Sequence, residues 1–203
     1  MLMKNSSLLV LILLLCNTLV FSGCVEETVN EPKAVDIDLA QVTLLLDDLN
    51  QSGFQKLNEE HVTETYVVSE GKLFEGLTVN EKIELYYINN TDFIIQQSAE
   101  LQTDTDAQQF IDELKATSTF PGQIDDWNFT SISIQQIGND SLLKQNTTEL
   151  QGEKATINML VFRVRNIVNI IVIGGSLPQK DIITYAKILE QRINDQISTQ
   201  QSS

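Results

Sequence analysis

Alternation of apolar and polar residues predicts β-strands along much of the chain. It is clearest in residues 129–136, where Ile132 and Ile134 share one face of the expected strand. The run Asn-Asn-Thr-Asp at 89–92 is typical of a turn and joins two further strands into a hairpin. In chain order, the first prediction is one or two strands within 54–68, with a break near 58–60. Further strands are predicted at 83–88, 93–101, 129–136, 142–144, 155–164 and 167–173. Residues 147–154 are predicted to form a loop.

The strongest predicted hairpin joins residues 155–164 to residues 167–173 through Arg165 and Asn166. Asn166 is expected to take the positive φ that a two-residue turn requires. The second arm is almost wholly apolar, which predicts a central strand buried on both faces. Gly174 and Gly175 then end this strand. Their spacing does not match a phosphate-binding loop, and no Lys-Ser or Lys-Thr pair follows them.

Three stretches repeat apolar residues at helical spacing. The first begins after Asp38, which is a suitable N-cap. The second covers about 107–116, with Asp104 or Asp106 as its cap, and the third covers 179–197 after Pro178. Their apolar faces consist of Leu39, Val42, Leu45, Leu46 and Leu49; of Phe110, Ile111 and Leu114; and of Ile182, Ile183, Ala186, Leu189 and Ile193.

These elements predict one α+β domain from residue 37 to 198, followed by a frayed tail at 199–203. The hairpins indicate a mostly antiparallel sheet of six to seven strands, because antiparallel strands can be joined by short turns. About three amphipathic helices are expected to cover the sheet.

The first 23 residues have the pattern of a secretory signal peptide. Lys4 gives a positive start, an apolar run from Leu8 to Cys16 follows, and small residues precede Cys24. The apolar run is shorter than the roughly 20 residues that a membrane-spanning helix needs. Phe21-Ser22-Gly23-Cys24 resembles the lipobox of prokaryotic lipoproteins, although Phe21 stands where an aliphatic residue is usual. We therefore expect lipid on Cys24, with residues 24–36 as anchor and flexible tether. An ordinary signal exit is the alternative.

Composition narrows the possible chemistry. The 203 residues carry a formal net charge of −15, which argues against nucleic-acid binding through phosphate contacts. Only two cysteines occur, Cys16 in the expected signal and Cys24, so the mature domain would have no disulfide and no thiolate metal site. His61 is the single histidine, which disfavours multi-histidine zinc sites and a serine–histidine pair. We expect no cofactor and no catalytic residue.

Several short motifs resemble two related families. They are Asp48-Leu49 with Gly53-Phe54, Asp106-Ala107, residues 137–141 (Ile-Gly-Asn-Asp-Ser), residues 161–168 (Val-Phe-Arg-Val-Arg-Asn-Ile-Val) and, in the last helix, Ala186 with Arg192-Ile193. This order is similar to PsbP-like α/β/α sandwiches in bacterial lipoproteins such as LpqN, and to PknH-type extracellular sensor domains of receptor kinases. Arg165 stands where glycine is usual, and the paired cysteines of the PknH-type domains are absent. The resemblance implies a non-catalytic domain outside the membrane with no set of catalytic residues.

Other residues admit a functional and a structural interpretation. Asp104 with Asp106, or Asp125 with Asp126, are candidate calcium ligands, but an Asp before a helix is usually a cap. His61 is expected to be a surface or strand histidine rather than a general base. Trp127 and Phe129 either line a groove or pack in the core. Arg163 and Arg165 either bind an anionic ligand or balance neighbouring acids.

Asn-X-Ser/Thr sequons after the expected signal include those that begin at Asn89, Asn128, Asn139 and Asn146. Asn89 and Asn146 fall in predicted loops and are the stronger candidates for glycosylation.

Two functional hypotheses follow. The first is a membrane-anchored lipoprotein on the outer face of the cytoplasmic membrane, which binds a small ligand or an envelope protein without catalysis. The second is an extracytoplasmic hydrolase or transferase that uses two carboxylates converging in a cleft, one of them with a raised pKa. A purely structural envelope component is not distinguished from the first by sequence.

Overall fold

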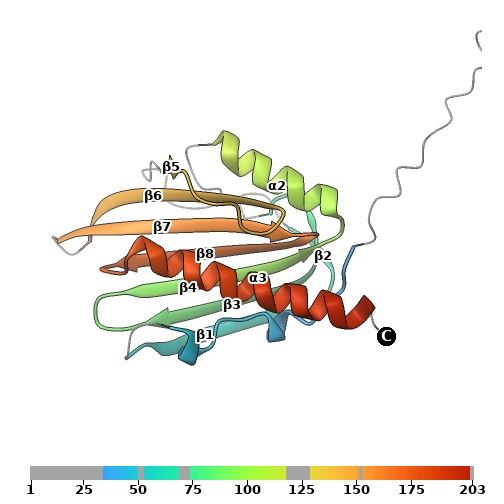
Figure 1. Cartoon of the computed structure of the whole chain (residues 1–203), viewed down its shortest axis with the longest axis horizontal. Helices are drawn as coiled ribbons and strands as arrows, with labels where there is room; N and C mark the ends of the chain where they lie inside the picture. Colours follow the sequence, from blue (N-terminus) through green and yellow to red (C-terminus); the bar gives the residue numbers. More distant parts are fainter. Residues whose placement is uncertain (1–33, 50–52, 69–73, 118–128, 151–152, 202–203) are drawn as a thin grey trace, which may run out of the picture. The chain divides into compact units, whose positions relative to one another are not determined.

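The computed structural model describes residues 34–49, 53–68, 74–117, 129–150 and 153–201. Within these ranges eight strands form one antiparallel sheet, against which two α-helices pack, α2 (Asp104–Ala116) and α3 (Gln179–Gln201) (Figure 1). The predicted α+β class is therefore confirmed, with one α-helix fewer than expected. The strands are β1 (Gln55–Val62), β2 (Tyr66–Val67), β3 (Thr78–Ile88), β4 (Phe93–Leu101), β5 (Thr130–Ile132), β6 (Asp140–Leu150), β7 (Glu153–Val164) and β8 (Ile167–Gly175).

The sheet has the order β1-β3-β4-β8-β7-β6-β5, and β2 also pairs with β3. The apolar strand β8 lies between β4 and β7, and its residues Ile167–Ile171 are buried, which confirms the predicted central strand. The β7–β8 hairpin and strand β4 also lie where the sequence predicts them.

Several strand boundaries differ from the prediction. Strand β3 begins at Thr78 rather than at residue 83, and β6 begins at Asp140 rather than at residue 142. The break after β1 falls at 63–65 rather than 58–60, where the strand continues just after a register shift between Lys56 and Asn58. Strand β5 ends at Ile132, so the expected strand over 129–136 is shortened. Residues 147–150, expected in a loop, continue β6 because β7 pairs with it as far as Leu150 opposite Glu153. This polar end has no apolar alternation that would reveal a strand.

The expected first helix is not formed. Residues 34–49, which we call the strap, contain only two 3₁₀ turns, η1 (Leu39–Gln41) and η2 (Leu46–Asp48). Asp38 caps η1 as predicted, with its side chain accepting from Ala40 N–H at 3.0 Å. Several other polar backbone groups of the strap find partners far along the chain. Gln96 accepts from Leu44 N–H at 2.7 Å and donates to the carbonyl of Val42 at 3.0 Å.

The two faces of the sheet have separate cores. On one face, α3 and the strap pack together over the sheet, with buried Leu39, Val42, Leu160, Phe162, Ile182 and Leu189. On the other face, α2 packs through Phe110, Ile111 and Leu114 against Met159, Val161, Val168 and Ile170. We call these the strap face and the α2 face.

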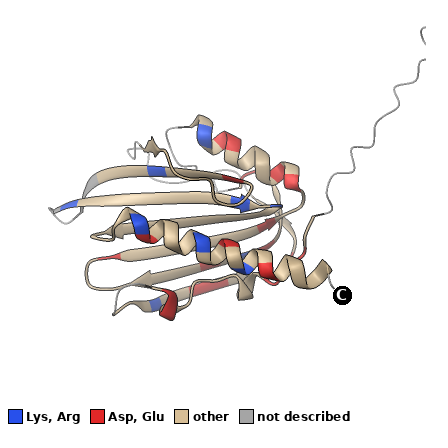
Figure 2. Cartoon of the chain, in the orientation of Figure 1, with Lys and Arg blue, Asp and Glu red and all other residues tan. Residues whose placement is uncertain are grey.

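Helix α3 begins after Pro178 as predicted and runs four residues past the expected end at Ile197, so residues 199–201 are helical rather than part of a frayed tail. Acidic and basic side chains are interspersed along α3, whereas α2 has acidic side chains in its first turn and one basic residue, Lys115, in its last turn (Figure 2). No helix in the described ranges is long and apolar enough to cross a bilayer.

Candidate functional site

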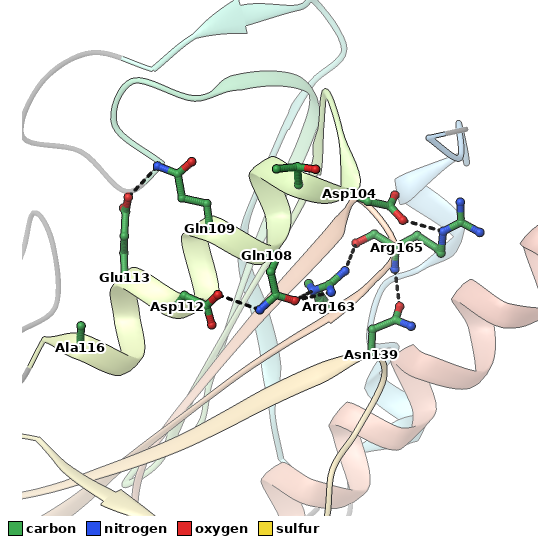
Figure 3. Close-up of a pocket in the computed structure, with 10 residues that line it drawn as sticks. Asp104, Gln108, Gln109, Asp112, Glu113, Ala116, Asn139, Arg163 and Arg165 are labelled. Carbon is green, nitrogen blue, oxygen red and sulfur yellow. Dashed lines mark hydrogen bonds and ion pairs between the residues drawn. The ribbon is translucent and has the colours of Figure 1, made fainter. Parts of the chain in front are cut away.

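A shallow groove of about 800 Å³ runs along α2 on the α2 face (Figure 3). One wall is the solvent side of α2, where Asp104, Gln108 and Asp112 follow one another at four-residue spacing and so share a face. The other wall comes from the end of β7 and from two turns. It is lined by Arg163, Arg165 and Asn139.

Local sequence explains why α2 starts where it does. Thr103, and not Asp104 or Asp106, is the N-cap, because its side chain accepts from Asp106 N–H at 3.0 Å. Asp104 and Asp106 lie in the first helical turn, where the helix dipole stabilises negative charge. This placement leaves the Asp104 carboxylate directed at the groove rather than folded back as a cap.

Arg165 holds the β7–β8 turn to both walls. Its Nε donates to Asp104 Oδ2 at 2.8 Å, and its backbone N–H donates to Asn139 Oδ1 at 2.7 Å (Figure 3). Arg165 has φ 59°, in the left-handed region, where a side chain costs roughly 1–2 kcal/mol. The positive φ predicted for Asn166 is therefore at Arg165. Asn166 is instead buried, and its amide bonds the strap at Val35 N–H and C=O and the carbonyl of Leu101.

Arg163 is held by neutral groups. Two of its guanidinium nitrogens, Nε at 3.0 Å and Nη2, donate to Gln108 Oε1, and Nη1 donates to the carbonyl of Arg165 at 3.2 Å. Among the described residues no carboxylate lies within ion-pair distance of it. Arg165 and Arg192 are different, since they pair with Asp104 and Asp48.

Gln108 links this guanidinium to a charged pair below the groove. Its Nε2 donates to Asp112 Oδ2 and Asp140 Oδ2, both at 3.0 Å, and Lys115 Nζ contacts the same Asp140 oxygen at 2.6 Å. Burial raises the pKa of Asp140, but the hydrogen bonds from Lys115 and Gln108 outweigh it, so the net pKa is lowered. Asp140 is thus held ionised.

Only one of the two carboxylate oxygens of Asp104 has a hydrogen-bond donor among the described residues. Its Oδ2 receives the Arg165 bond, whereas its Oδ1 is buried without a hydrogen-bond donor among the described residues. A buried acceptor left unpaired costs about 1–3 kcal/mol. The groove therefore contains a carboxylate whose present contacts are incomplete.

The other candidates lie away from this groove. His61 is an exposed residue of β1 with Nε2 2.5 Å from Glu81 Oε1. Phe129 packs at the edge of the α2-face core. In the described ranges no group of three or more His, Cys, Asp or Glu side chains gathers. Asp125, Asp126, Trp127 and Asn128 lie outside the described residues, as do residues 1–33 with Cys24.

The structure describes the settings of Asn89, Asn139 and Asn146, and only that of Asn146 differs from the prediction. Asn146 is in β6, opposite Ile157, and not in the predicted loop. Asn89 is in the predicted turn, where its Oδ1 accepts from the backbone N–H of Thr91 and Asp92 and its Nδ2 donates to Asp92 at 3.2 Å. Asn139 has its Oδ1 occupied by Arg165 N–H. Glycosylation stays a prediction at each.

Sequence reasoning found Arg163, Arg165 and Asp104 but missed Gln108 and the pairing of Lys115 with Asp140. The four-residue spacing of Asp104, Gln108 and Asp112 was an available signal that one helix face is polar. Nothing local indicates that this face meets the β7–β8 turn.

The fold has solved counterparts. The crystal structure of the extracellular domain of PknH from Mycobacterium tuberculosis is similar with a TM-score of 0.60 and 12% identity, covering 80% of this chain and 98% of that domain. A putative uncharacterized protein (Rv0999 ortholog) from Mycobacterium smegmatis has a TM-score of 0.46 and 12% identity, covering 82% of this chain and 98% of that chain. This TM-score is too low to support a conclusion. No protein-family model and no curated protein matches the chain.

The first likeness confirms the PknH-type part of the expected resemblance at the level of the fold, which is as far as 12% identity reaches. The lipoprotein and PsbP-like parts stay predictions.

Proposed function

We propose that this protein is an exported lipoprotein whose α+β domain acts on the outer face of the cytoplasmic membrane as a non-catalytic binding or sensor-like module. The observation that carries the proposal is the groove along α2, because its volume of about 800 Å³ lies within the range of small-ligand sites. The likeness to an extracellular domain supports the placement by analogy of fold. An envelope protein remains the alternative occupant, and nucleic acid is disfavoured by the charge.

Lipid on Cys24 would be the membrane partner. Two long chains hold a protein on a bilayer where one barely does, since each buried CH₂ contributes about 0.8 kcal/mol. Near the start of the strap, Asn166 bonds Val35 to the sheet. The residues from Cys24 to Val35 can span at most about 40 Å, so the domain would stay close to the membrane surface.

The alternative, a carboxylate-dependent hydrolase or transferase, finds less support. It needs two acids that converge in a cleft, one of them kept protonated. In the groove, Asp104 is paired with Arg165, and below it Asp140 has a lowered pKa. Among the described carboxyl groups, the raised pKa belongs to Glu100, which lies on the strap face beneath Ile37 and not in the groove.

Intact-mass measurement of protein extracted from its native membrane tests the anchor. We expect a chain that begins at Cys24 and carries added lipid mass. Cys24→Ala should lose that mass and be released. An unlipidated, freely secreted wild-type chain would contradict the anchor.

Thermal shift of the full chain tests binding. The panel contains sugars, amino acids, amines, phosphate and carboxylic acids. At least one class should raise Tm, and Ala116→Trp, which fills the end of the groove beside the last turn of α2, should reduce the increase. The matched Thr184→Trp, on the exposed side of α3, should keep it. No shift with any class, or a shift that Ala116→Trp leaves unchanged, would contradict a binding groove.

A further inference from the structure

Arg163 has more N–H donors than its contacts with described residues use. A guanidinium has five N–H groups, and the contacts to Gln108 and to the Arg165 carbonyl use three of them. The other two, one on each terminal nitrogen, have no partner among the described residues. N–H groups on the two terminal nitrogens of a guanidinium can bind the oxygens of a carboxylate or a phosphate.

Arg192 shows what a structural arginine looks like in this protein. Its two terminal nitrogens bind both oxygens of Asp48, at 2.8 and 3.0 Å, and it also donates to the carbonyl of Thr43. Arg163 instead lines the groove, and no acid in the described part of the chain contacts its terminal nitrogens. The chain has three arginines, and two of them line this groove although the net charge is −15.

The backbone conformation of Arg165 also supports a functional role for its side chain. Glycine would occupy φ 59° without the steric cost that a side chain has there. The left-handed turn places this guanidinium on the groove wall, where its Nε binds Asp104 (Figure 3). Strain of this kind persists where the side chain has a use.

Asp104 is the group that such a ligand would replace. It makes one contact to Arg165, and its second oxygen is buried with no donor in the described ranges. An anion with two or three oxygens could bind Arg163 and Arg165 together, while Asp104 turned toward solvent and hydrated both its oxygens.

We infer that the groove binds a small ligand through a phosphate or carboxylate group held by Arg163 and Arg165, and that this group displaces Asp104 from Arg165. Gln108 and Asn139 position the two arginines and do not carry the charge recognition. The inference rests on the proposed binding function and names its ligand chemistry. The oxyanion is either a free solute or the headgroup of a lipid.

The test is an NMR titration of the full chain in dodecyl maltoside, following the side-chain Nε–H of Arg163 and the backbone amide of Arg165. Inorganic phosphate and succinate are the probes, each up to about 10 mM, a range that detects millimolar dissociation constants. We expect saturable shifts at both signals. Arg163→Gln should weaken binding at least about tenfold, since charge-assisted hydrogen bonds are lost. Lys180→Gln, an exposed residue of α3, removes the same charge and should leave binding unchanged.

Two further variants separate recognition from folding. Arg165→Gly relieves the left-handed strain, so it should keep the wild-type Tm within a few degrees, yet weaken anion binding at least about tenfold. Asp104→Asn should strengthen binding several-fold, because the internal competitor is lost. Asp47→Asn changes the net charge equally at an exposed site on the strap and should not strengthen it. Weaker binding in Asp104→Asn would overturn the displacement.

A lipid source is tested by adding phosphatidylglycerol to the dodecyl maltoside micelles in place of phosphate. Shifts with this lipid but not with phosphate or succinate would identify a headgroup, and shifts with the free anions would identify a solute. If neither source moves the two signals, the inference is wrong. The proposed function would survive that result if another class in the thermal-shift panel bound in an Ala116→Trp-sensitive way, and would fail with it otherwise.

Discussion

Gln96 and Gln108 are residues of the same type on opposite faces of one sheet, but their side-chain amides bond different kinds of groups. Gln96 is fully buried on the strap face, where it bonds Leu44 N–H, the Val42 carbonyl and Ser98 Oγ. Ser98 in turn donates to Asn169 at 2.7 Å. Gln108 is half-buried, and its partners are the charged side chains of Arg163, Asp112 and Asp140.

The difference separates structural polar groups from available ones. On the strap face, buried amides replace the hydrogen bonds that the strap would have made as a helix, so removing one leaves backbone groups unpaired. In the groove, the amide only orients a guanidinium, and water can reach the groups it releases. The same chemistry therefore supports folding on one face and recognition on the other.

The variant with the largest expected effect tests this comparison directly. Gln96→Ala should lower the free energy of unfolding by about 3 kcal/mol, because the backbone groups of Val42 and Leu44 lose their partners in the core. Gln108→Ala should lower it by less than about 1 kcal/mol. Urea unfolding followed by circular dichroism measures both. Equal losses would mean that the two faces do not differ as described.

A smaller effect concerns Lys144, the buried cation of the α2 face. Its ammonium donates to the carbonyls of Leu114 at 2.5 Å and of Thr117 at the end of α2, and burial lowers its pKa. Lys144→Met keeps the packing but loses both bonds, so we expect destabilisation of about 1 kcal/mol at pH 7.

The lowered pKa of Lys144 also determines the direction in which stability should change with pH. The folded state binds fewer protons than the unfolded state between that lowered pKa and the ordinary value of 10.5, so its contribution to stability rises with pH in this window. Unfolding measured from pH 7 to 10 should show the gap between wild type and Lys144→Met widening. A constant or narrowing gap would contradict the assignment.

The smallest effect concerns Glu100, the buried acid of the strap face. Burial raises its pKa, the bond from Asn80 at 2.9 Å opposes this, and Asp36 and Glu81 add repulsion. The folded state therefore holds the proton above pH 4.5, and this contribution to stability falls as pH rises through the raised pKa.

Glu100→Gln removes that pH dependence and should stabilise the protein at pH 7, by no more than about 1 kcal/mol. At pH 4 the variant and the wild type should be nearly equal. Thermal unfolding at the two pH values measures this. Glu60→Gln, on the exposed edge strand β1, is the matched control and should change neither value.

Sequence periodicity determined the parts of the fold whose partners lie nearby. Strand β4 has the predicted bounds, the β7–β8 hairpin has the predicted connection, and α3 starts after Pro178. In each, alternation, helical spacing or a turn residue acts within a few positions, so the local preference and the final structure agree.

Only the tertiary structure decided the strap and the groove. The spacing of Leu39, Val42 and Leu49 suits a helix, yet these side chains are buried equally well in a segment whose backbone bonds Gln96, Tyr87 and Arg192. Those partners lie 43 to 149 residues away, beyond any local pattern. The groove likewise joins α2 to two distant turns. Long-range hydrogen bonds outweighed helix propensity in the strap, and the same long-range packing placed two arginines beside Asp104.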